Sequence, residues 1–284
     1  MKKITLTILF LITISAVSFS QISQIEKNVL LDLYKSTNGD SWNNTWDLTK
    51  PAENWYGVTI SNNTVTKIDL KMNNLEGSIP ASIGKLKSLT HLNLGFNKLN
   101  GEIPVELCEN KSLETLELFM NQLEGEIPFN IGKITNLKEI TLFNNFLSGE
   151  LPNSIYNLNK LEILQLSSNK LSGSISKEIG NLKQLKVISF FDNLMHGNLP
   201  NEIGLLKNLK ELSLSNNLFE GNLPVEISNL TNLKTLLLNK NNFIGDLNPI
   251  IKNLSALKNV EYSAPKEKEI YSNPVSQATI IPIN

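Results

Sequence analysis

The segment LTHLNLGFNKLNGEIPVELCENKS (residues 89–112) decides the fold, because its pattern recurs eight times without insertion between residues 65 and 256. The period is 24 residues. When the eight segments are aligned on their first residues, position 9 is always Asn and position 13 is always Gly. Positions 1, 4, 6, 11, 15 and 19 hold only Leu, Ile, Val, Met or Phe. A fixed period of this length predicts a solenoid, in which stacked coils bury one continuous core.

The positions of the repeat predict where each side chain lies. Side chains of a strand alternate between its two faces, so positions 4 and 6, such as Leu92 and Leu94, should point inward. Positions 3, 5 and 7 should then face solvent. Position 9 follows the strand, where backbone groups lose their partners in the sheet, and a buried amide can satisfy them. We therefore expect a structural ladder of Asn73, Asn97, Asn121, Asn145, Asn169, Asn193, Asn217 and Asn241.

Each segment also carries the motif L-x-G-x-[IL]-P-x-x-[IL]-G or a close variant, as in residues 75–84. In this motif the chain resembles the plant-type leucine-rich repeats of receptor ectodomains, polygalacturonase inhibitors and secreted bacterial proteins. The resemblance implies an α/β solenoid: a right-handed superhelix with a parallel concave sheet, a second short strand in each coil and a helical N-terminal cap. Ser176 and Asn248 replace the Pro of the motif, and Asn110 replaces an apolar residue at position 22. We expect these three departures to loosen the convex side locally.

The first 20 residues are typical of a signal peptide. Lys2 and Lys3 precede the apolar stretch 4–17, and the small residues Ser18 and Ser20 then form a cleavage site before Gln21. The apolar stretch is shorter than the ~20 residues that a membrane span needs. We therefore expect export, with the protein secreted or attached to the outer cell surface and with no transmembrane segment.

Residues 21–64 are predicted to form the N-terminal cap. Ser23 and Glu26 have the spacing of a capping box at the start of a helix. The apolar stripe of that helix should comprise Ile25, Val29, Leu30, Leu33 and Tyr34. Residues 61–64 read as a hairpin turn into the first repeat. The three Trp residues of the chain, at 42, 46 and 55, seal the apolar end of the first coil or, alternatively, form a platform for a ligand.

Residues 257–284 contain a truncated ninth repeat and a tail. The segment 270–276 resembles the opening of the C-terminal sorting domains of the type IX secretion route, with Ser272 in place of a Pro. The tail is either a remnant of such a sorting domain or a C-terminal cap that pairs with the ninth coil.

Composition and spacing argue against catalysis, metal binding and nucleic-acid binding. His91 and His196 occupy different faces of the repeat, and neither has metal-ligand spacing with Cys or carboxylates. Asp69 and Glu117 share position 5 on an open surface, where nothing is expected to raise a carboxyl pKa. The net charge is −1 and Arg is absent. Cys108 is the only cysteine, so no intrachain disulfide can form. We expect no enzyme activity, metal or cofactor, and a monomer.

The concave surface is the predicted site of partner binding, because exposed aromatic residues with a polar surround are typical of interfaces. The predicted partner-binding residues are Phe96, Phe119, Met120, Phe143, Ile163, Val187 and Phe191. Alternatively, the Phe side chains only stack along the sheet and stabilise it. The predicted function is therefore a recognition module for a protein or glycan. The alternatives are a surface-display protein without a specific ligand and an inhibitor of an extracellular enzyme.

Overall fold

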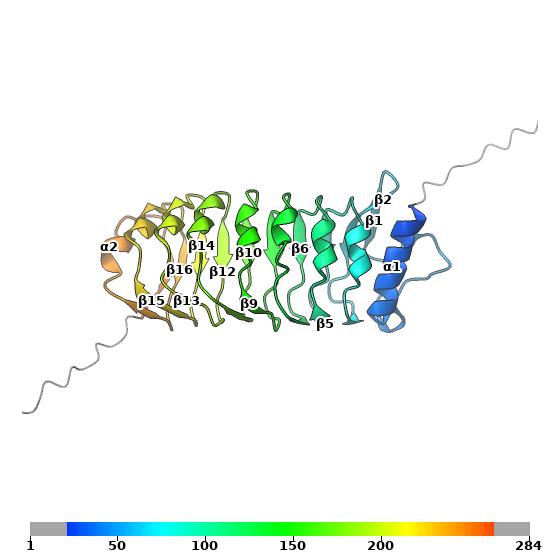
Figure 1. The fold of residues 1–284 in the computed structure, drawn as a ribbon, viewed down its shortest axis with the longest axis horizontal. Coiled ribbons are helices and arrows are strands. Elements are labelled where there is room, and N and C mark those ends of the chain that lie inside the picture. The colour runs from blue at the N-terminus through cyan, green and yellow to red at the C-terminus, as the bar shows by residue number, and fades with distance from the viewer. Residues whose placement is uncertain (1–21, 264–284) are drawn as a thin grey trace, which may run out of the picture.

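Residues 22–263 are described by the computed structural model, and they form an elongated stack of coils with a helix packed on its N-terminal end (Figure 1). The predicted signal peptide lies outside these residues, as does the tail with its resemblance to a sorting domain. Within residues 22–263, no helix is long and apolar enough to cross a membrane. This shape matches the solenoid predicted from the 24-residue period.

Each coil contributes one strand to a ten-stranded sheet along the concave side. The first strand, β1 (Val58–Ser61), is antiparallel to β2, and all later neighbours are parallel in a register that pairs equal repeat positions, such as Leu92 with Leu116. The parallel strands are β2 (Thr64–Asp69), β4 (His91–Asn93), β6 (Thr115–Glu117), β8 (Glu139–Thr141), β10 (Ile163–Gln165), β12 (Val187–Ser189), β14 (Glu211–Ser213), β16 (Thr235–Leu237) and β18 (Asn259–Glu261).

The motif with the invariant Gly forms the second, shorter strands that the resemblance implied. They pair in three small parallel sheets, β3–β5–β7, β9–β11 and β13–β15–β17. These strands are β3 (Glu76–Gly77), β5 (Lys98–Glu102), β7 (Gln122–Glu124), β9 (Ser148–Glu150), β11 (Lys170–Ser172), β13 (His196–Gly197), β15 (Leu218–Asn222) and β17 (Asn242–Ile244). The invariant Gly has a positive φ in all eight coils, a conformation that other residues adopt only with strain. This requirement explains why position 13 admits no other residue.

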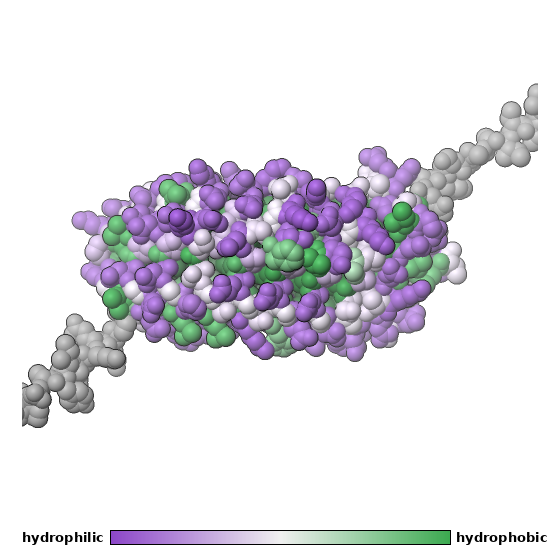
Figure 2. All heavy atoms as spheres, viewed as in Figure 1, coloured by the Kyte–Doolittle hydropathy of each residue, from purple (hydrophilic) through white to green (hydrophobic). Residues whose placement is uncertain are grey.

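A short helix closes each coil on the convex side. Seven are 3₁₀ helices: η3 (Ala81–Lys85), η4 (Val105–Glu109), η5 (Ile131–Lys133), η6 (Asn153–Asn157), η7 (Lys177–Asn181), η8 (Asn201–Leu205) and η9 (Val225–Asn229). The eighth coil has the α-helix α2 (Asn248–Ile251). Figure 2 shows mostly hydrophilic side chains on the side of the molecule that it presents, with hydrophobic ones gathered over the middle coils. The inward positions of the repeat are buried in one continuous core that also includes the cap.

The position-9 Asn side chains join successive coils through hydrogen bonds. In the fourth coil, Asn145 Nδ2 donates to the carbonyls of Leu118 and Leu142, both at 3.0 Å. Its Oδ1 accepts from the N–H of Leu123 at 3.0 Å. The same pattern recurs from Asn97 to Asn241. In the first coil, Asn73 Oδ1 instead accepts from the N–H of Asn44 at 2.7 Å, which ties the cap to the array.

The cap begins with α1 (Gln24–Ser36), and Ser23 accepts from the N–H of Glu26 at 3.2 Å. Glu26 is buried, and its Oε1 accepts from the N–H of Val65 at the start of the first repeat. One residue of the predicted stripe is wrong: Ile25 is 62% exposed, because the buried face of α1 instead begins at Glu26 and continues through Val29, Leu30, Leu33 and Tyr34. The hairpin prediction is confirmed, since Asn62 and Asn63 form the turn between β1 and β2 with positive φ.

The three Trp residues are buried inside the cap and are not exposed as a platform for a ligand. Trp46 stacks on Trp55 with ring centroids 4.8 Å apart, and Trp42 packs edge-on against Trp46 at 4.9 Å. Each indole N–H donates to a backbone carbonyl, as Trp42 does to Thr37 at 2.8 Å. This geometry supports the interpretation of the cluster as a seal over the first coil.

The convex side is not loosened at Ser176, contrary to expectation. The helix η7 that follows is five residues long, like five of the other six 3₁₀ helices of the repeats. Ser176 Oγ accepts from the N–H of Glu178, and the N–H of Ser176, which a Pro would lack, donates to the hydroxyl of buried Tyr156 at 3.1 Å. A local hydrogen-bond network therefore replaces the Pro.

The other two departures from the motif, Asn248 and Asn110, change the convex side in different ways: one alters the type of helix and the other forms a buried hydrogen bond. At Asn248 the 3₁₀ helix is replaced by α2, while the strands on either side, β16 and β18, keep their register. Asn110 is fully buried, and its Nδ2 donates to the carbonyl of Ile83 at 3.0 Å.

Neighbouring Cys108 is also buried, and burial raises the pKa of its thiol to about 12. A thiol with this pKa stays protonated at neutral pH and acts as a small packed residue.

Candidate functional site on the concave face

Three Phe side chains form a stack across the second, third and fourth coils, and we call Phe96, Phe119 and Phe143 the aromatic stack. Phe119 lies parallel to Phe143 with ring centroids 4.8 Å apart, and Phe96 meets Phe119 edge-on at 5.8 Å. Phe119 and Phe143 share position 7, whereas Phe96 occupies position 8. Because position 7 of the second coil is Gly95, the ring of Phe119 lies over that coil, where a Cβ on Gly95 would approach it within 2.7 Å.

The expectation that Phe119 is an exposed aromatic residue is wrong. Its side chain is only 7% exposed, because Phe96 and Phe143 cover the ring and Gly95 lets it lie flat against the sheet. The ammonium of Lys71 lies 5.2 Å from the centroid of this ring and 5.8 Å from that of Phe96. Phe119 is thus the centre of the stack, while Phe96, at 42% exposure, offers its ring to solvent.

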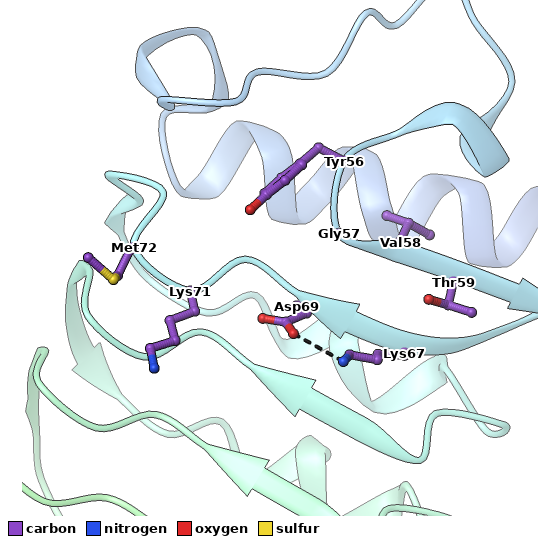
Figure 3. Close-up of a pocket in the computed structure, with 8 residues that line it drawn as sticks. All are labelled: Tyr56, Gly57, Val58, Thr59, Lys67, Asp69, Lys71 and Met72. Carbon is purple, nitrogen blue, oxygen red and sulfur yellow. Dashed lines mark ion pairs between the residues drawn. The ribbon is translucent and has the colours of Figure 1, made fainter.

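A hollow of about 700 Å³ lies beside the stack, between the cap and the first coil (Figure 3). Tyr56 of the cap faces Lys71 and Asp69 of the first coil across it, and Lys67 forms an ion pair with Asp69 at 3.1 Å. A second hollow, of about 380 Å³, lies between Met72, Phe96 and Met120. Lys71 lines the first hollow and contacts the stack, while Met72 lines both hollows.

Two carboxyl groups near the stack have raised pKa values, which corrects the expectation that nothing on this face would raise one. Burial raises the pKa of Glu117, and repulsion from Glu139 and Asp69 raises it further, against the effects of Lys71 and Lys67. Burial also raises the pKa of Glu139, although His91 acts in the opposite direction. The physical cause is that neighbouring strands half-cover these side chains, so the surface is less open than its sequence suggests.

The other predicted residues do not all join the stack. Met120 lines the hollow beside Phe96. Ile163 and Val187 are neighbours on β10 and β12, and both are half-buried. Phe191 is separated from Phe143 by Ser167 at position 7, and no ring contact joins it to the stack within residues 22–263. The predicted site therefore divides into two regions, one around the aromatic stack and one around Phe191.

Two features of the surface escaped the sequence analysis. Lys71 shares position 7 with Phe119, and only the structure places its charge against two rings. On the convex side, Phe129 is 76% exposed and lines a hollow with Val105 between Glu102 and Glu126. The sequence did contain a signal for Phe129, because it occupies position 17, where the other coils hold mostly small or polar residues. In the described part of the chain, no group of His, Cys, Asp and Glu residues is placed to hold a metal.

The comparisons with known proteins agree with this architecture. Residues 65–196 match the family model of a leucine-rich repeat region, and residues 208–230 match that of a leucine-rich repeat. The chain thus contains leucine-rich repeats, and its fold is a leucine-rich repeat solenoid. A comparison with curated protein sequences gave no match.

Several solved structures are similar to the chain. The receptor kinase HAESA of Arabidopsis, in complex with the peptide hormone IDA and the co-receptor SERK1, is 28% identical, with a TM-score of 0.76 over 85% of this chain and 42% of that one. The plant peptide hormone receptor RGFR1, in complex with RGF2, is 34% identical, with a TM-score of 0.64 over 66% of this chain and 31% of that one.

A bacterial structure is also similar. A leucine-rich repeat protein of Leptospira interrogans is 37% identical, with a TM-score of 0.58 over 66% of this chain and 48% of that one. The chain spans less than half the length of each of these three structures.

Proposed function

We propose that this protein is a secreted or cell-surface recognition module of the bacterial kind, which binds a protein partner through the aromatic stack without catalysis. The observation that carries the proposal is the clustering of the stack, Lys71 and the two carboxylates Glu117 and Glu139 on one half of the concave face. The similarity to ectodomains solved with peptide hormones supports a protein partner.

The chemistry of this half indicates the kind of segment that the partner presents. Aromatic anchors beside hollows commonly accept an apolar side chain, which would pack on Phe96 and Phe143. Lys67 is already paired with Asp69, whereas burial and, to a smaller extent, repulsion from Glu139 and Asp69 raise the pKa of Glu117. A cationic side chain of the partner would relieve that repulsion. The partner segment thus combines an apolar side chain with Lys or Arg.

The proposal is tested with the double variant Phe96→Ser/Phe143→Ser. A partner is first isolated on the immobilised protein from surface extracts and identified, and its affinity is then measured by calorimetry. Truncation of a central aromatic anchor commonly weakens binding by ~2 kcal/mol. We expect the double variant to lose at least about tenfold in affinity, which corresponds to about 1.4 kcal/mol.

Phe146→Ser is the matched control, because Phe146 is an aromatic residue at 50% exposure, compared with 42% for Phe96, and it lies at position 10, away from positions 3, 5 and 7. It should leave the affinity unchanged. If the double variant remains folded by circular dichroism and binds the partner as tightly as the wild type, the aromatic stack is not the binding site.

A further inference from the structure

A separate hollow of about 460 Å³ lies on the C-terminal half of the concave face, around Phe191. At position 7, Phe191 stands between Ser167 of the preceding coil and Ser215 of the following one. Ser189 and Ser213 occupy position 5 of the sixth and seventh coils. Phe191 is 41% exposed, so its ring forms a single aromatic surface within a group of four hydroxyls.

Two oxygens of this hollow lack partners. Ser215 Oγ and Asn239 Oδ1 are buried, and neither has a hydrogen-bond partner among residues 22–263. Ser215 is 3% exposed and lines the hollow. Ser167 and Ser189 instead bond to each other at 2.7 Å. A buried oxygen without a partner is unfavourable for the free protein, and both Ser215 and Asn239 line the hollow. These two oxygens therefore point to a ligand that carries hydrogen-bond donors.

We propose that this hollow binds a sugar residue of a neutral glycan. One face of a pyranose ring is apolar and would lie on the ring of Phe191, while its hydroxyl groups would donate to Ser215 Oγ and Asn239 Oδ1. Adjacent strands repeat every ~4.8 Å, so the serines of neighbouring coils offer hydroxyls at intervals that suit the several hydroxyls of one sugar ring. The site is separate from the aromatic stack, because no ring contact within residues 22–263 joins Phe191 to the stack, and none of Phe96, Phe119 and Phe143 lines this hollow.

The charges around the hollow favour a neutral ligand. Only two charged residues line it, Lys240 and Glu261, and their charges are opposite. The remaining lining residues are four serines, Asn239, Phe191 and Leu237. A phosphorylated or acidic ligand would be attracted by Lys240 but repelled by Glu261, so the hollow has no net charge that favours an anion. A peptide offers backbone donors in a single row, whereas a sugar offers an apolar face ringed by hydroxyls, which matches one aromatic ring among serines.

The test is a titration of the isotope-labelled protein with neutral oligosaccharides of glucose, mannose and galactose, followed by NMR. We expect at least one of these oligosaccharides to shift the amide signals of Phe191, Ser215 and Asn239. Phe191→Ser should weaken that binding at least tenfold, and Ser215→Ala should weaken it severalfold. Because Ser215 Oγ has no partner within residues 22–263, Ser215→Ala should leave the melting temperature unchanged or higher, which separates loss of binding from loss of folding.

Controls distinguish this site from the others. Phe146→Ser and the exposed-site variant Ser174→Ala should leave oligosaccharide binding unchanged, and Phe191→Ser should leave binding to the aromatic stack unchanged. The proposal is overturned if no oligosaccharide shifts these signals at millimolar concentration, if binding persists in both Phe191→Ser and Ser215→Ala, or if a peptide ligand occupies the hollow instead.

Discussion

The two halves of the concave face use the same repeat positions for different chemistry. In the N-terminal half, position 7 holds Phe119 and Phe143 beside two carboxyls with raised pKa values. In the C-terminal half, the same position holds Ser167, Phe191 and Ser215. The strands beneath them pair in one register throughout. The comparison teaches that the inward positions and the Asn ladder determine the backbone, while the outward positions are free to carry different ligand chemistry.

A substitution in the Asn ladder of a central coil, which both halves share, should have the largest effect on the free energy of unfolding. Asn145→Ala removes an amide that bridges three backbone groups of two coils. The groups left without partners are buried, so we expect the free energy of unfolding to fall by roughly 1–3 kcal/mol. Denaturant melts would measure the loss. Asn241→Ala, in the last full coil and more exposed, should lose less, and equal, negligible losses at both sites would show that the ladder is not structural.

A second substitution pair compares the same repeat position in the two halves. Phe119 is buried within the stack, so Phe119→Ser should lower the free energy of unfolding by about 1–3 kcal/mol. Phe191 makes no ring contact with the stack and is partly exposed, so Phe191→Ser should change stability by less than about 0.5 kcal/mol. Thermal melts of both variants would measure the difference. Similar losses for the two would mean that the halves are equally packed.

The smallest effect concerns acidification at Glu117 in the N-terminal half, although burial also raises the pKa of Glu211 in the C-terminal half. Burial and like charges raise the pKa of Glu117, so its ionised form destabilises the fold above that pKa. This destabilisation is relieved as pH falls through the raised pKa, and it is absent below the unfolded-state value. The wild type should therefore gain stability relative to Glu117→Gln as pH falls, a difference that paired melts at several pH values would measure.

The same titration should affect binding with the opposite sign. A cationic partner segment prefers the ionised carboxylates, so its affinity for the aromatic-stack half should decrease as pH falls through the raised pKa of Glu117. In Glu117→Gln this pH dependence should be smaller. Binding of a neutral sugar around Phe191 should not follow this titration, and an equal pH dependence in both halves would contradict the division between them.

The fold was predictable from the sequence because its determinants are local and repeat eight times. The strands at positions 3–5 and the turn at Asn62 and Asn63 follow from spacing and backbone preference, and the resemblance to plant-type leucine-rich repeats implied the second strands. The site was only partly predictable, since contacts between coils depend on small neighbours. Gly95 determines that Phe119 is buried, and Tyr156 determines that Ser176 needs no Pro. Such compensations join residues about 20 to 24 positions apart and leave no periodic signal.

The turn after each concave strand has a further consequence. Position 8 has a positive φ in every full coil, and none of these residues is Gly. Asn and Asp tolerate this left-handed conformation, and they occupy it at Asn144, Asp192 and Asn216. In the first three coils the same strained conformation is held by Met72, Phe96 and Met120. Ser168 and Lys240 hold it in the fifth and eighth coils. Residues other than Asn and Asp are less well suited to this conformation, and three of these five lie in the half of the molecule that carries the aromatic stack.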